Sequence, residues 1–542
     1  MKDRKTPRLW EALPWIWLAA AWAGAVAFTA LWGRTCLDSD MASEMVLASQ
    51  LNREGGILST NWYYSTELRV FCEQLLFKVG LMIFPDNWHL ARVLAQAVLL
   101  AALAGSYLFF ARGVGLRGSG AWGAAALMCP FGFWYLFHGI FGGFYLPHMI
   151  LLLLSQGLVL RLVRAKTLPR ALGTGALLAA VCGAAGLNGV RLIMNLYLPL
   201  ILTALVLLWL GARDAGFARS AVRRELRLTG ASLLMLAASG AGYLVNTAVL
   251  ARNHHFSAQE QRTWLEMSFE KLADTWLDFL SLFGYPLDSS VFEIGGQTST
   301  IALFSVSGVL GAFGIVLAGA VAVSLVRLLV RHRELSFEQN TVVFLLAAIL
   351  VVDGMIFAWT HGKQEVNASH WLPVVPLAFA VLQMEGETEH FRLPHARRWL
   401  ASAFAACVLL CSAGTVDHFL NHTPRARKGM TEVCGWLMEQ GYSQGIATFW
   451  NSNVLTELSN GEIEMWTVGN LETPYPQTWL QSTAHDAFPE GPVFVLLYGE
   501  ETALDLPYAS ADGSDVVYRD GNGFVILAYD SVEPLVRALE GA

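Results

Sequence analysis

An acidic cluster, Asp38-Ser39-Asp40 followed by Glu44, stands directly after the first long apolar segment of the chain. Carboxylates so close to a membrane are costly unless they are hydrated, paired or bound to a cation. Such a cluster could take a proton from a hydroxyl nucleophile, and Asp38, Asp40 and Glu44 could also bind a divalent cation. The structural alternative is that Asp40 caps a helix that begins at Met41.

A second group of candidate residues follows in the same loop. Aromatic rings stack on the apolar faces of a sugar, and polar side chains hydrogen-bond to its hydroxyls. The candidate sugar-binding residues are Tyr63 and Tyr64 in Asn61-Trp62-Tyr63-Tyr64, and Glu67 and Arg69 in Glu67-Leu68-Arg69, with Glu44 beside them. An aromatic belt at the membrane interface would give the same composition.

Basic side chains recur at the ends of later apolar segments. A phosphate-bearing lipid headgroup at the membrane surface requires cationic partners at this level. The candidates for this role are Arg92, His138, His148, Arg191, His361, Lys363 and His370. Each alone is more often an interfacial anchor, but together on the side of the acidic loop they indicate a site.

The elements that must position these residues are membrane-spanning helices. Of 542 residues, 55% are hydrophobic and 15% are charged, against roughly a quarter charged in soluble domains. Apolar stretches of about 17–25 residues recur, and each can cross a hydrocarbon core of about 30 Å. The sequence therefore predicts about eleven spans, at 14–32, 89–111, 121–137, 147–163, 171–187, 192–210, 229–250, 301–326, 341–360, 371–384 and 399–416.

The charges between these spans predict their orientation. With the N-terminus in the cytoplasm, the basic clusters all fall on the cytoplasmic side, as the positive-inside rule requires. These clusters are Arg112 and Arg117; Arg161, Arg164, Lys166 and Arg170; Arg213, Arg219, Arg223, Arg224 and Arg227; Arg327, Arg331 and Arg333; and Arg392, Arg397 and Arg398. We therefore expect a multi-pass cell-membrane protein whose C-terminal region is extracytoplasmic.

The predicted fold is an α-helical polytopic membrane domain, residues 1–420, followed by a small extracytoplasmic α/β domain, residues 421–542. Outer loops 33–88 and 251–300 are long, and their amphipathic stretches are expected to lie along the membrane surface. In the tail, a helical pattern at Gly429–Gln440 precedes short β-like runs. These runs are Gly445–Trp450, Val493–Tyr498 and Gly523–Tyr529.

Several other classes of site are not expected. The seven cysteines form no CxxC or Cys/His cluster, so a structural zinc site is not predicted. A Cys36–Cys72 disulfide is an alternative, although free thiols are favoured. No basic stripe interleaved with aromatic residues is present, so nucleic acid is not an expected partner.

In this layout the chain resembles the GT-C membrane glycosyltransferases, which include protein O-mannosyltransferases and lipid A aminoarabinose transferases. The resemblance rests on the order of short motifs: Asp38 and Asp40 after the first helix, a long outer loop, and Arg92 in "HLARVLAQAVLL" opening the next span. Many members open a late span with Arg-Tyr before two prolines. This chain has His370-Trp371-Leu372-Pro373-Val374-Val375-Pro376 instead.

The resemblance implies a mechanism. A polyprenyl-phosphate-linked sugar would enter from the outer leaflet, and a carboxylate would deprotonate an acceptor hydroxyl that attacks the anomeric carbon in one inverting step. Asp40 is the expected base, because it lies nearest the amphipathic helix, and Asp38 is the second candidate. Basic side chains would stabilise the departing lipid phosphate. No cofactor is required, although a divalent cation could bind near the carboxylates.

Two other functional classes stay open. A transporter or flippase would be favoured by inverted repeats and by helices interrupted near the midplane, and Asp353 inside a predicted span could serve a relay or a packing role. A non-catalytic protein of envelope assembly would use the outer domain as its working part. Neither the sugar nor the acceptor, whether an envelope glycan, a lipid or a protein, follows from the sequence.

Overall fold

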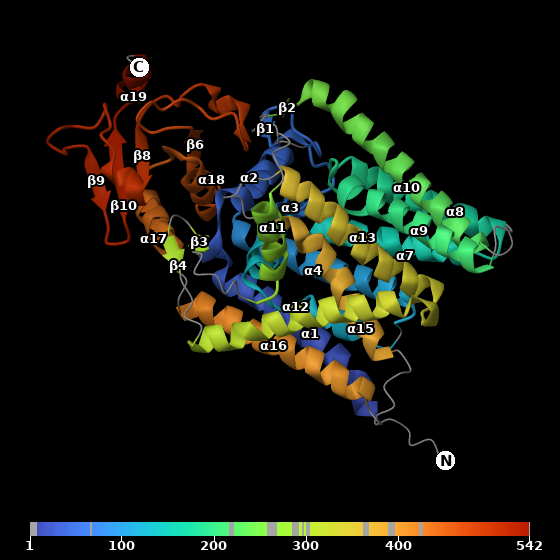
Figure 1. Cartoon of the computed structure of the whole chain (residues 1–542). Coiled ribbons are helices and arrows are strands. Elements are labelled where there is room, and N and C mark those ends of the chain that lie inside the picture. Colours follow the sequence, from blue (N-terminus) through green and yellow to red (C-terminus); the bar gives the residue numbers. More distant parts are fainter. Residues whose placement is uncertain are drawn as a thin grey trace.

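The computed structural model describes residues 8–65, 68–116, 118–215, 222–256, 268–284, 292–294, 297–299, 304–360, 368–387, 396–421 and 426–540. A bundle of long helices lies beside a smaller domain that contains a sheet (Figure 1). Three of the predicted binding residues, Glu67, His361 and Lys363, lie outside the described residues.

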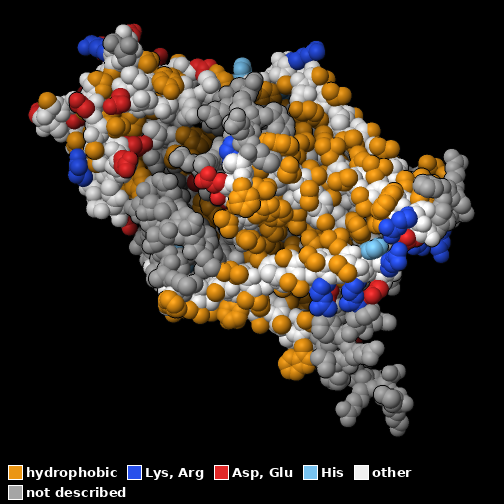
Figure 2. All heavy atoms as spheres, viewed as in Figure 1, with side chains coloured by type: hydrophobic (Ala, Val, Ile, Leu, Met, Phe, Trp, Pro, Cys, Tyr) orange, Lys and Arg blue, Asp and Glu red, His pale blue; other side chains and the backbone are white. Residues whose placement is uncertain are grey.

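Nine helical segments in the described part of the chain are long and apolar enough to cross a membrane. They contain α1 (Arg8–Trp32), α4 (Trp88–Val114), α7 (Leu146–Arg164), α8 (Leu168–Gly186), α9 (Leu198–Ala215), α10 (Arg223–Ala248), α12 (Val306–Val330), α13 (Phe337–Thr360) and α16 (Ala396–Asn421). Hydrophobic side chains cover the visible flank of these helices, and Lys and Arg side chains gather at the end away from the C-terminal domain (Figure 2). The chain is a multi-pass membrane protein, as the sequence predicts.

The predicted span at 121–137 is broken rather than continuous. It forms α5 (Gly120–Ala126), the short α6 (Phe133–Tyr135) and the π-helical turn η2 (Leu136–Gly142). The break contains Pro130, which has no N–H to continue a helix, and Gly132, which pairs with Gly284 in an isolated bridge. A Cβ on Gly132 would lie 2.1 Å from the carbonyl oxygen of Leu282, so this close approach requires glycine.

The predicted span at 371–384 is interrupted rather than a regular helix. It consists of α14 (Ala368–Trp371), the 3-10 turn η6 (Leu372–Val374) and α15 (Val375–Glu387). These elements follow one another without a gap, and together they extend for about 30 Å. Two of the predicted spans are therefore interrupted segments, and the other nine are the long apolar helices of the described chain.

The first outer loop folds into η1 (Gly33–Cys36), α2 (Ser39–Glu54), β1 (Trp62–Tyr64) and α3 (Gln74–Ile83). α2 packs against both α3 and α18 (Phe449–Leu458) of the C-terminal domain, and most of its apolar side chains are buried. The expectation that this amphipathic helix lies on the membrane surface is wrong, because its apolar face contacts protein. α3 exposes Val79, Met82 and Ile83, and its length of about 15 Å is too short to cross a membrane.

The second outer loop contains β2 (His255–Phe256), α11 (Phe269–Ser281) and a hairpin of β3 (Phe292–Ile294) and β4 (Gln297–Ser299). α11 packs on α13 and α14. It exposes Phe269, Leu277 and Leu280, which is compatible with a helix at the membrane surface.

A three-stranded sheet connects three distant parts of the chain. β1 lies between β2 and β7 (Gln481–Ser482) of the C-terminal domain. Tyr63 in β1 stands opposite His255 in β2 and opposite Gln481 in β7. Loops 33–88 and 251–300 and the C-terminal domain are therefore hydrogen-bonded to one another through this sheet.

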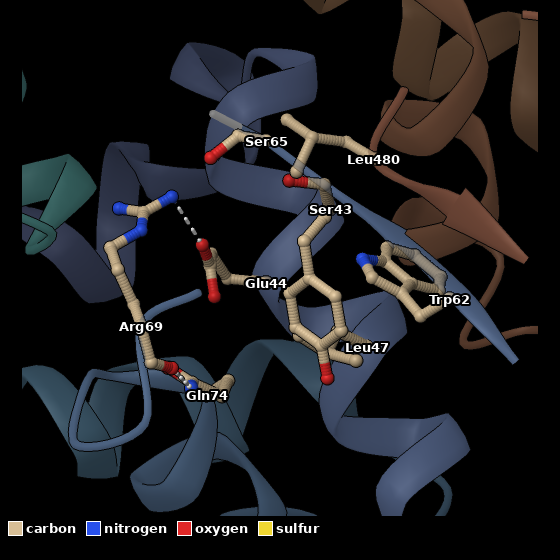
Figure 3. A pocket seen from close by; sticks show the side chains of 9 residues that line it. Ser43, Glu44, Leu47, Trp62, Ser65, Arg69, Gln74 and Leu480 are labelled. Carbon is tan, nitrogen blue, oxygen red and sulfur yellow. Dashed lines mark hydrogen bonds and ion pairs between the residues drawn. The ribbon is translucent and has the colours of Figure 1, made fainter. Parts of the chain in front are cut away.

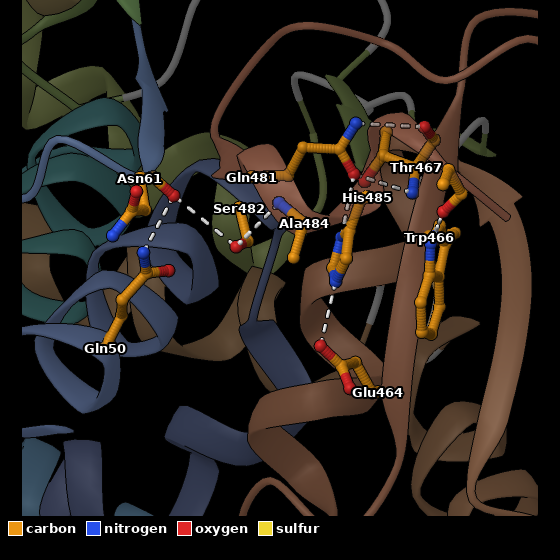
Figure 4. A network of polar contacts seen from close by, with 10 residues as sticks. Gln50, Asn61, Glu464, Trp466, Thr467, Gln481, Ser482, Ala484 and His485 are labelled. Carbon is orange, nitrogen blue, oxygen red and sulfur yellow. Dashed lines mark hydrogen bonds and ion pairs between the residues drawn. The ribbon is translucent and has the colours of Figure 1, made fainter. Parts of the chain in front are cut away.

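A polar contact at β7 reinforces this connection, since the Ser482 hydroxyl donates to the carbonyl oxygen of Asn61 at 3.4 Å (Figure 4). Within the C-terminal domain, the Gln481 Oε1 accepts a hydrogen bond from the Thr467 N–H at 3.0 Å and lies 3.1 Å from His485 Nδ1. His485 Nε2 lies 2.9 Å from Glu464 Oε1, and this hydrogen bond lowers the pKa of Glu464. These contacts hold the segment that contains β7 in place.

The C-terminal domain is a five-stranded mixed sheet with helices. Its strands are β5 (Gln444–Thr448), β6 (Glu464–Val468), β8 (Val493–Tyr498), β9 (Val516–Arg519) and β10 (Phe524–Tyr529), and its helices are α17 (Ala426–Glu439), α18 and α19 (Glu533–Glu540). The strand order is β6-β5-β8-β10-β9, with β5 parallel to both neighbours and β10 antiparallel to both of its own. The predicted helix and the three predicted β-runs overlap α17, β5, β8 and β10, which confirms a small α/β fold.

The C-terminal domain is attached to the helical bundle through the C-terminal end of α18. Arg34 Nη2 donates to the carbonyl oxygen of Leu458 at 3.1 Å, and the Trp88 N–H donates to Asn460 Oδ1 at 2.9 Å. The Ser39 hydroxyl donates to the carbonyl oxygen of Phe449 at the other end of the helix. The domain therefore covers the start of α2, where the acidic cluster lies.

Candidate active site

Asp38 and Asp40 stand at the start of α2, just beyond the outer end of α1. Asp38 is the N-cap of α2, because its Oδ1 accepts a hydrogen bond from the Met41 N–H at 2.8 Å. The structural alternative that Asp40 caps this helix is therefore wrong. Asp40 lies in the first turn, and its carboxylate accepts no hydrogen bond from the residues that the structure describes.

Arg69 lies at the centre of the acidic cluster. Its Nη2 donates to Glu44 Oε1 at 2.9 Å, and the two side chains are 23% and 6% exposed. Figure 3 shows this pair beside Trp62 and Gln74 at a small cavity, which Tyr64 also lines. The cavity volume is about 10 Å³, room for roughly one water molecule.

Burial, together with neighbouring carboxylates, raises two pKa values in this cluster. Burial, followed by the negative charge of Asp38, raises the pKa of Asp40 to about 7, although Arg69 acts in the opposite direction. Burial, followed by the charge of Glu44, raises the pKa of Glu73 to about 7 as well. A carboxylate that titrates near neutral pH is suited to general base catalysis.

The two tyrosines of β1 point to different neighbours. Tyr63 donates from its hydroxyl to Asp486 Oδ2 at 2.8 Å, and therefore contacts the C-terminal domain. Tyr64 is buried, and its hydroxyl accepts a hydrogen bond from the Ser59 N–H at 2.9 Å. Only Tyr64 lines the cavity beside Glu44 and Arg69.

One arginine and two histidines surround the ring of Tyr145, the residue before α7. The guanidinium of Arg191 lies 4.9 Å from the ring centroid of Tyr145, a cation–π distance. The ring centroids of His138 and His370 lie 5.8 Å and 6.4 Å from the same ring. His148, in the first turn of α7, is 3% exposed, and its Nδ1 has no hydrogen-bond partner among the described residues.

Arg69 lies between the acidic cluster and the residues around Tyr145. It interacts electrostatically with both Asp40 and His148, and Arg191 also interacts with His148. No described carboxylate forms an ion pair with Arg191. The structure therefore brings most of the predicted candidates into one continuous region, with carboxylates at one end and Arg191 among histidines at the other.

Arg92 lies elsewhere in the outer structure. Its Nε and Nη2 donate to the two carboxylate oxygens of Glu457, both at 2.6 Å, and Nη2 also donates to the carbonyl oxygen of Met41 at 2.8 Å. The Arg92 and Glu457 side chains are 2% and 3% exposed. These contacts join α4, α2 and α18, so Arg92 positions the helix that carries Asp40.

The structure bears on two further sequence-based expectations. Cys36 and Cys72 are both buried free thiols, and the Cys72 thiol donates to Glu73 Oε2 at 2.8 Å. In the described part of the chain, no group of three or more His, Cys, Asp or Glu side chains is arranged to hold a metal ion. A cation bound by Asp38, Asp40 and Glu44 therefore stays a prediction.

Sequence reasoning did not select two residues of this region. Glu73 lies within the acidic cluster and is fully buried, but no motif in the sequence distinguishes it from other charges of the first loop. Tyr145 is one of many aromatic residues near helix ends. Its role depends on the three segments that bring Arg191, His138 and His370 to one ring, and no sequence pattern reports that convergence.

Asp353 lies inside α13 and is 1% exposed. Neither carboxylate oxygen has a hydrogen-bond partner among the described residues. The structure therefore separates Asp353 from the outer carboxylates, and no described ion pair includes it.

The fold is similar to those of solved membrane proteins. ArnT from Cupriavidus metallidurans bound to undecaprenyl phosphate matches with a TM-score of 0.55 and 14% identity, over 95% of this chain and 97% of that chain. The apo state of the same protein matches with a TM-score of 0.52 and 15% identity, over 94% and 98% of the two chains. No family model and no curated protein matches the chain.

The archaeal oligosaccharyltransferase of Archaeoglobus fulgidus also matches, over 88% of this chain and 69% of that chain, at 12% identity. Its TM-score of 0.44 is too low to support an argument. The ArnT structures, in contrast, match over almost the whole of both chains, so the C-terminal domain is part of the shared architecture. The chain therefore shares the overall fold of the ArnT structures, in agreement with the fold that the sequence resemblance implies.

Proposed function

We propose that this chain is a membrane glycosyltransferase that moves a hexose or pentose from a polyprenyl-phosphate donor to an extracytoplasmic hydroxyl. The observation that carries the proposal is the raised pKa of Asp40 in a cluster that also contains Arg69 and that continues to Arg191. The fold adds support, because ArnT with this architecture was solved with undecaprenyl phosphate bound.

In the proposed reaction, Asp40 accepts the proton of the acceptor hydroxyl. The hydroxyl oxygen forms a bond to the anomeric carbon of the donor as the bond from that carbon to the phosphate oxygen breaks. Attack from the face opposite the phosphate inverts the anomeric configuration. A pKa of about 7 keeps Asp40 largely ionised at mildly alkaline pH while leaving it a stronger base than an ordinary aspartate.

The cations have a separate role at the leaving group. Negative charge develops on the lipid phosphate as the bond to the sugar breaks, and fixed cations that face this charge stabilise the transition state. Arg191 and Arg69 are the strongest candidates, with His148 and His370 beside them. The acceptor is an envelope glycan, a lipid or a protein.

The proposed orientation places this site on the extracytoplasmic side. Basic residues such as Arg161, Arg164 and Lys166 lie at the opposite end of the bundle, where the positive-inside rule predicts the cytoplasm. The C-terminal domain lies on the same side as the site and covers it.

No cofactor is required in this proposal. A divalent cation at Asp38, Asp40 and Glu44 would have to share Glu44 with Arg69, and one oxygen of Asp38 already accepts the Met41 N–H. Carboxylate oxygens are suitable ligands for Mg²⁺ or Ca²⁺. The transfer assay should therefore include a reaction that contains a metal chelator.

The test is a transfer assay with the purified full-length protein in nanodiscs, a panel of radiolabelled polyprenyl-phosphate sugars, and envelope extract as the source of acceptor. We expect label from one donor to enter a new product, and Asp40→Asn to abolish this transfer. Glu500→Gln, which neutralises an exposed carboxylate on the C-terminal domain, is the matched control and should retain full transfer.

Two outcomes would oppose the proposal. Full transfer by Asp40→Asn would remove Asp40 as the base. No transfer and no hydrolysis of any donor would favour a transporter or a non-catalytic envelope protein instead.

A further inference from the structure

A second polar cavity lies at the turn between α7 and α8, at the end of the bundle away from the C-terminal domain. Its volume is about 590 Å³, and four cationic side chains line it, from Arg161, Arg164, Lys166 and Arg170. Gly173 and Thr174 of α8 complete the described wall. No carboxylate is among these lining residues, so the cavity has a strong positive charge.

Two of the four cations already have partners that hold them in place. Arg164 Nε donates to Glu338 Oε1 at 2.6 Å. The guanidinium of Arg161 lies 3.8 Å from the ring centroid of Phe109. These contacts hold Arg161 and Arg164 in place, and only the charge of Arg164 is paired with a carboxylate.

The other two cations, Lys166 and Arg170, are exposed, and no described carboxylate pairs with either of them. They flank the N-terminus of α8, a helix of 19 residues, whose dipole also favours an anion. The backbone of the turn is held as well, since Arg227 Nη1 donates to the carbonyl oxygens of Val163 and Ala165 at 3.1 Å and 3.0 Å. The cavity is therefore a preorganised site for an anion.

Apolar side chains on α8 indicate what kind of anion fits. Leu177 is 54% exposed and Ala180 is also exposed. They lie one and two turns beyond Gly173, on the face of α8 that lines the cavity. A free anion would not use this surface. A phospholipid would place its phosphate among the cations and its acyl chains along this apolar face.

We propose that this cavity binds the phosphate of an anionic phospholipid in the leaflet on the N-terminal side of the membrane. The site is separate from the candidate active site, because α7 runs between them from Leu146 to Arg164. This inference does not depend on the reaction proposed above.

The test measures lipid binding to the full-length protein in an uncharged detergent, by native mass spectrometry. Phosphatidylglycerol, phosphatidylcholine and inorganic phosphate are the three probes. We expect phosphatidylglycerol to bind more tightly than phosphatidylcholine, and Lys166→Gln/Arg170→Gln to weaken its binding by roughly tenfold or more, since each cation near an anionic lipid contributes measurably.

The matched control is Arg331→Gln/Arg333→Gln, which removes the same charge from the same end of the bundle. Those two arginines already pair with Glu334 and Asp214, so phosphatidylglycerol binding should change less than twofold. An equal loss of phosphatidylglycerol binding in the two double variants would contradict the proposed site. Equal binding of phosphatidylglycerol and phosphatidylcholine to the unaltered protein would contradict it as well. Displacement of phosphatidylglycerol by inorganic phosphate, but not by chloride at the same ionic strength, would overturn the lipid as its ligand.

Discussion

Two arginine–glutamate pairs contact α2, and they differ in how far water reaches them. The Arg92–Glu457 pair has two hydrogen bonds, and both side chains are at most 3% exposed. The Arg69–Glu44 pair has one, and Arg69 keeps 23% of its side chain exposed. Identical residue types therefore serve different purposes at the two sites.

The surroundings of each pair explain the difference. Both carboxylate oxygens of Glu457 bind Arg92 in a buried interface between α2, α4 and α18. Arg69 instead faces the carboxylates of Asp40, Glu44 and Glu73, so its single positive charge is shared among several groups. We call the buried Arg92–Glu457 pair the closed pair and the partly exposed Arg69–Glu44 pair the open pair. We infer that the closed pair holds α2 in place and that the open pair adjusts the pKa of Asp40, the proposed base.

Arg92→Ala breaks the closed pair and should have the largest effect. It leaves Glu457 buried without its cation, and removal of one partner from a buried pair costs about 3–5 kcal/mol. Denaturant unfolding of the detergent-purified protein measures this loss. Arg92→Met combined with Glu457→Leu should recover part of the stability, whereas a loss below about 1 kcal/mol for Arg92→Ala would contradict a structural role.

Arg69→Ala breaks the open pair and should change the pH dependence of transfer. Arg69 lowers the pKa of Asp40, so its removal should raise that pKa further and move the rising limb of the pH–rate profile to higher pH. Activity at neutral pH should fall by about tenfold for each unit that the limb moves. Arg69→Lys keeps the charge and serves as control. If the rising limb of the pH–rate profile does not move in Arg69→Ala, Arg69 does not control the pKa of Asp40.

Tyr145→Leu tests the end of the site that contains Arg191. The ring holds Arg191 by a cation–π contact, which contributes about 0.5–1 kcal/mol. The KM for the polyprenyl-phosphate donor should therefore rise about two- to fivefold, with a smaller change in kcat. Tyr145→Phe retains the ring and should behave like the unaltered protein; if it is as impaired as Tyr145→Leu, the phenol hydroxyl and not the ring is responsible.

Tyr63→Phe should have the smallest effect. It removes one partly exposed hydrogen bond to Asp486, which should reduce stability by about 0.5 kcal/mol. A double-mutant cycle with Asp486→Ala, measured by denaturant unfolding, isolates this contact. Loss of transfer without loss of stability would instead indicate that Tyr63 contacts the substrate.

The sequence predicts the local parts of this fold well. Apolar stretches identify the long spans because hydrophobicity over about 20 residues is a local property. Asp38, Asp40 and Glu44 meet because they lie within two turns of one helix, and short runs of β-branched and aromatic residues predict β8 and β10. These signals need no knowledge of tertiary contacts.

Long-range contacts explain what could not be predicted. Arg92 and Glu457 are 365 positions apart, and nothing near either residue identifies its partner. The break at Pro130 depends on the close approach of Gly132 to Leu282 and Gly284. The burial of α2 depends in the same way on α18, and without it the helix has the pattern of an interfacial segment.

The pH dependence of sugar transfer by the unaltered protein and by Asp40→Asn, at saturating donor, tests the central claim most directly. The account predicts that the rate of the unaltered protein rises with pH and levels off above about 7, as Asp40 ionises. Asp40→Asn should be slower by about 100-fold or more and should lose this rise. A variant that transfers sugar at nearly the normal rate, with the same rise near neutral pH, would contradict the assignment of Asp40 as the base.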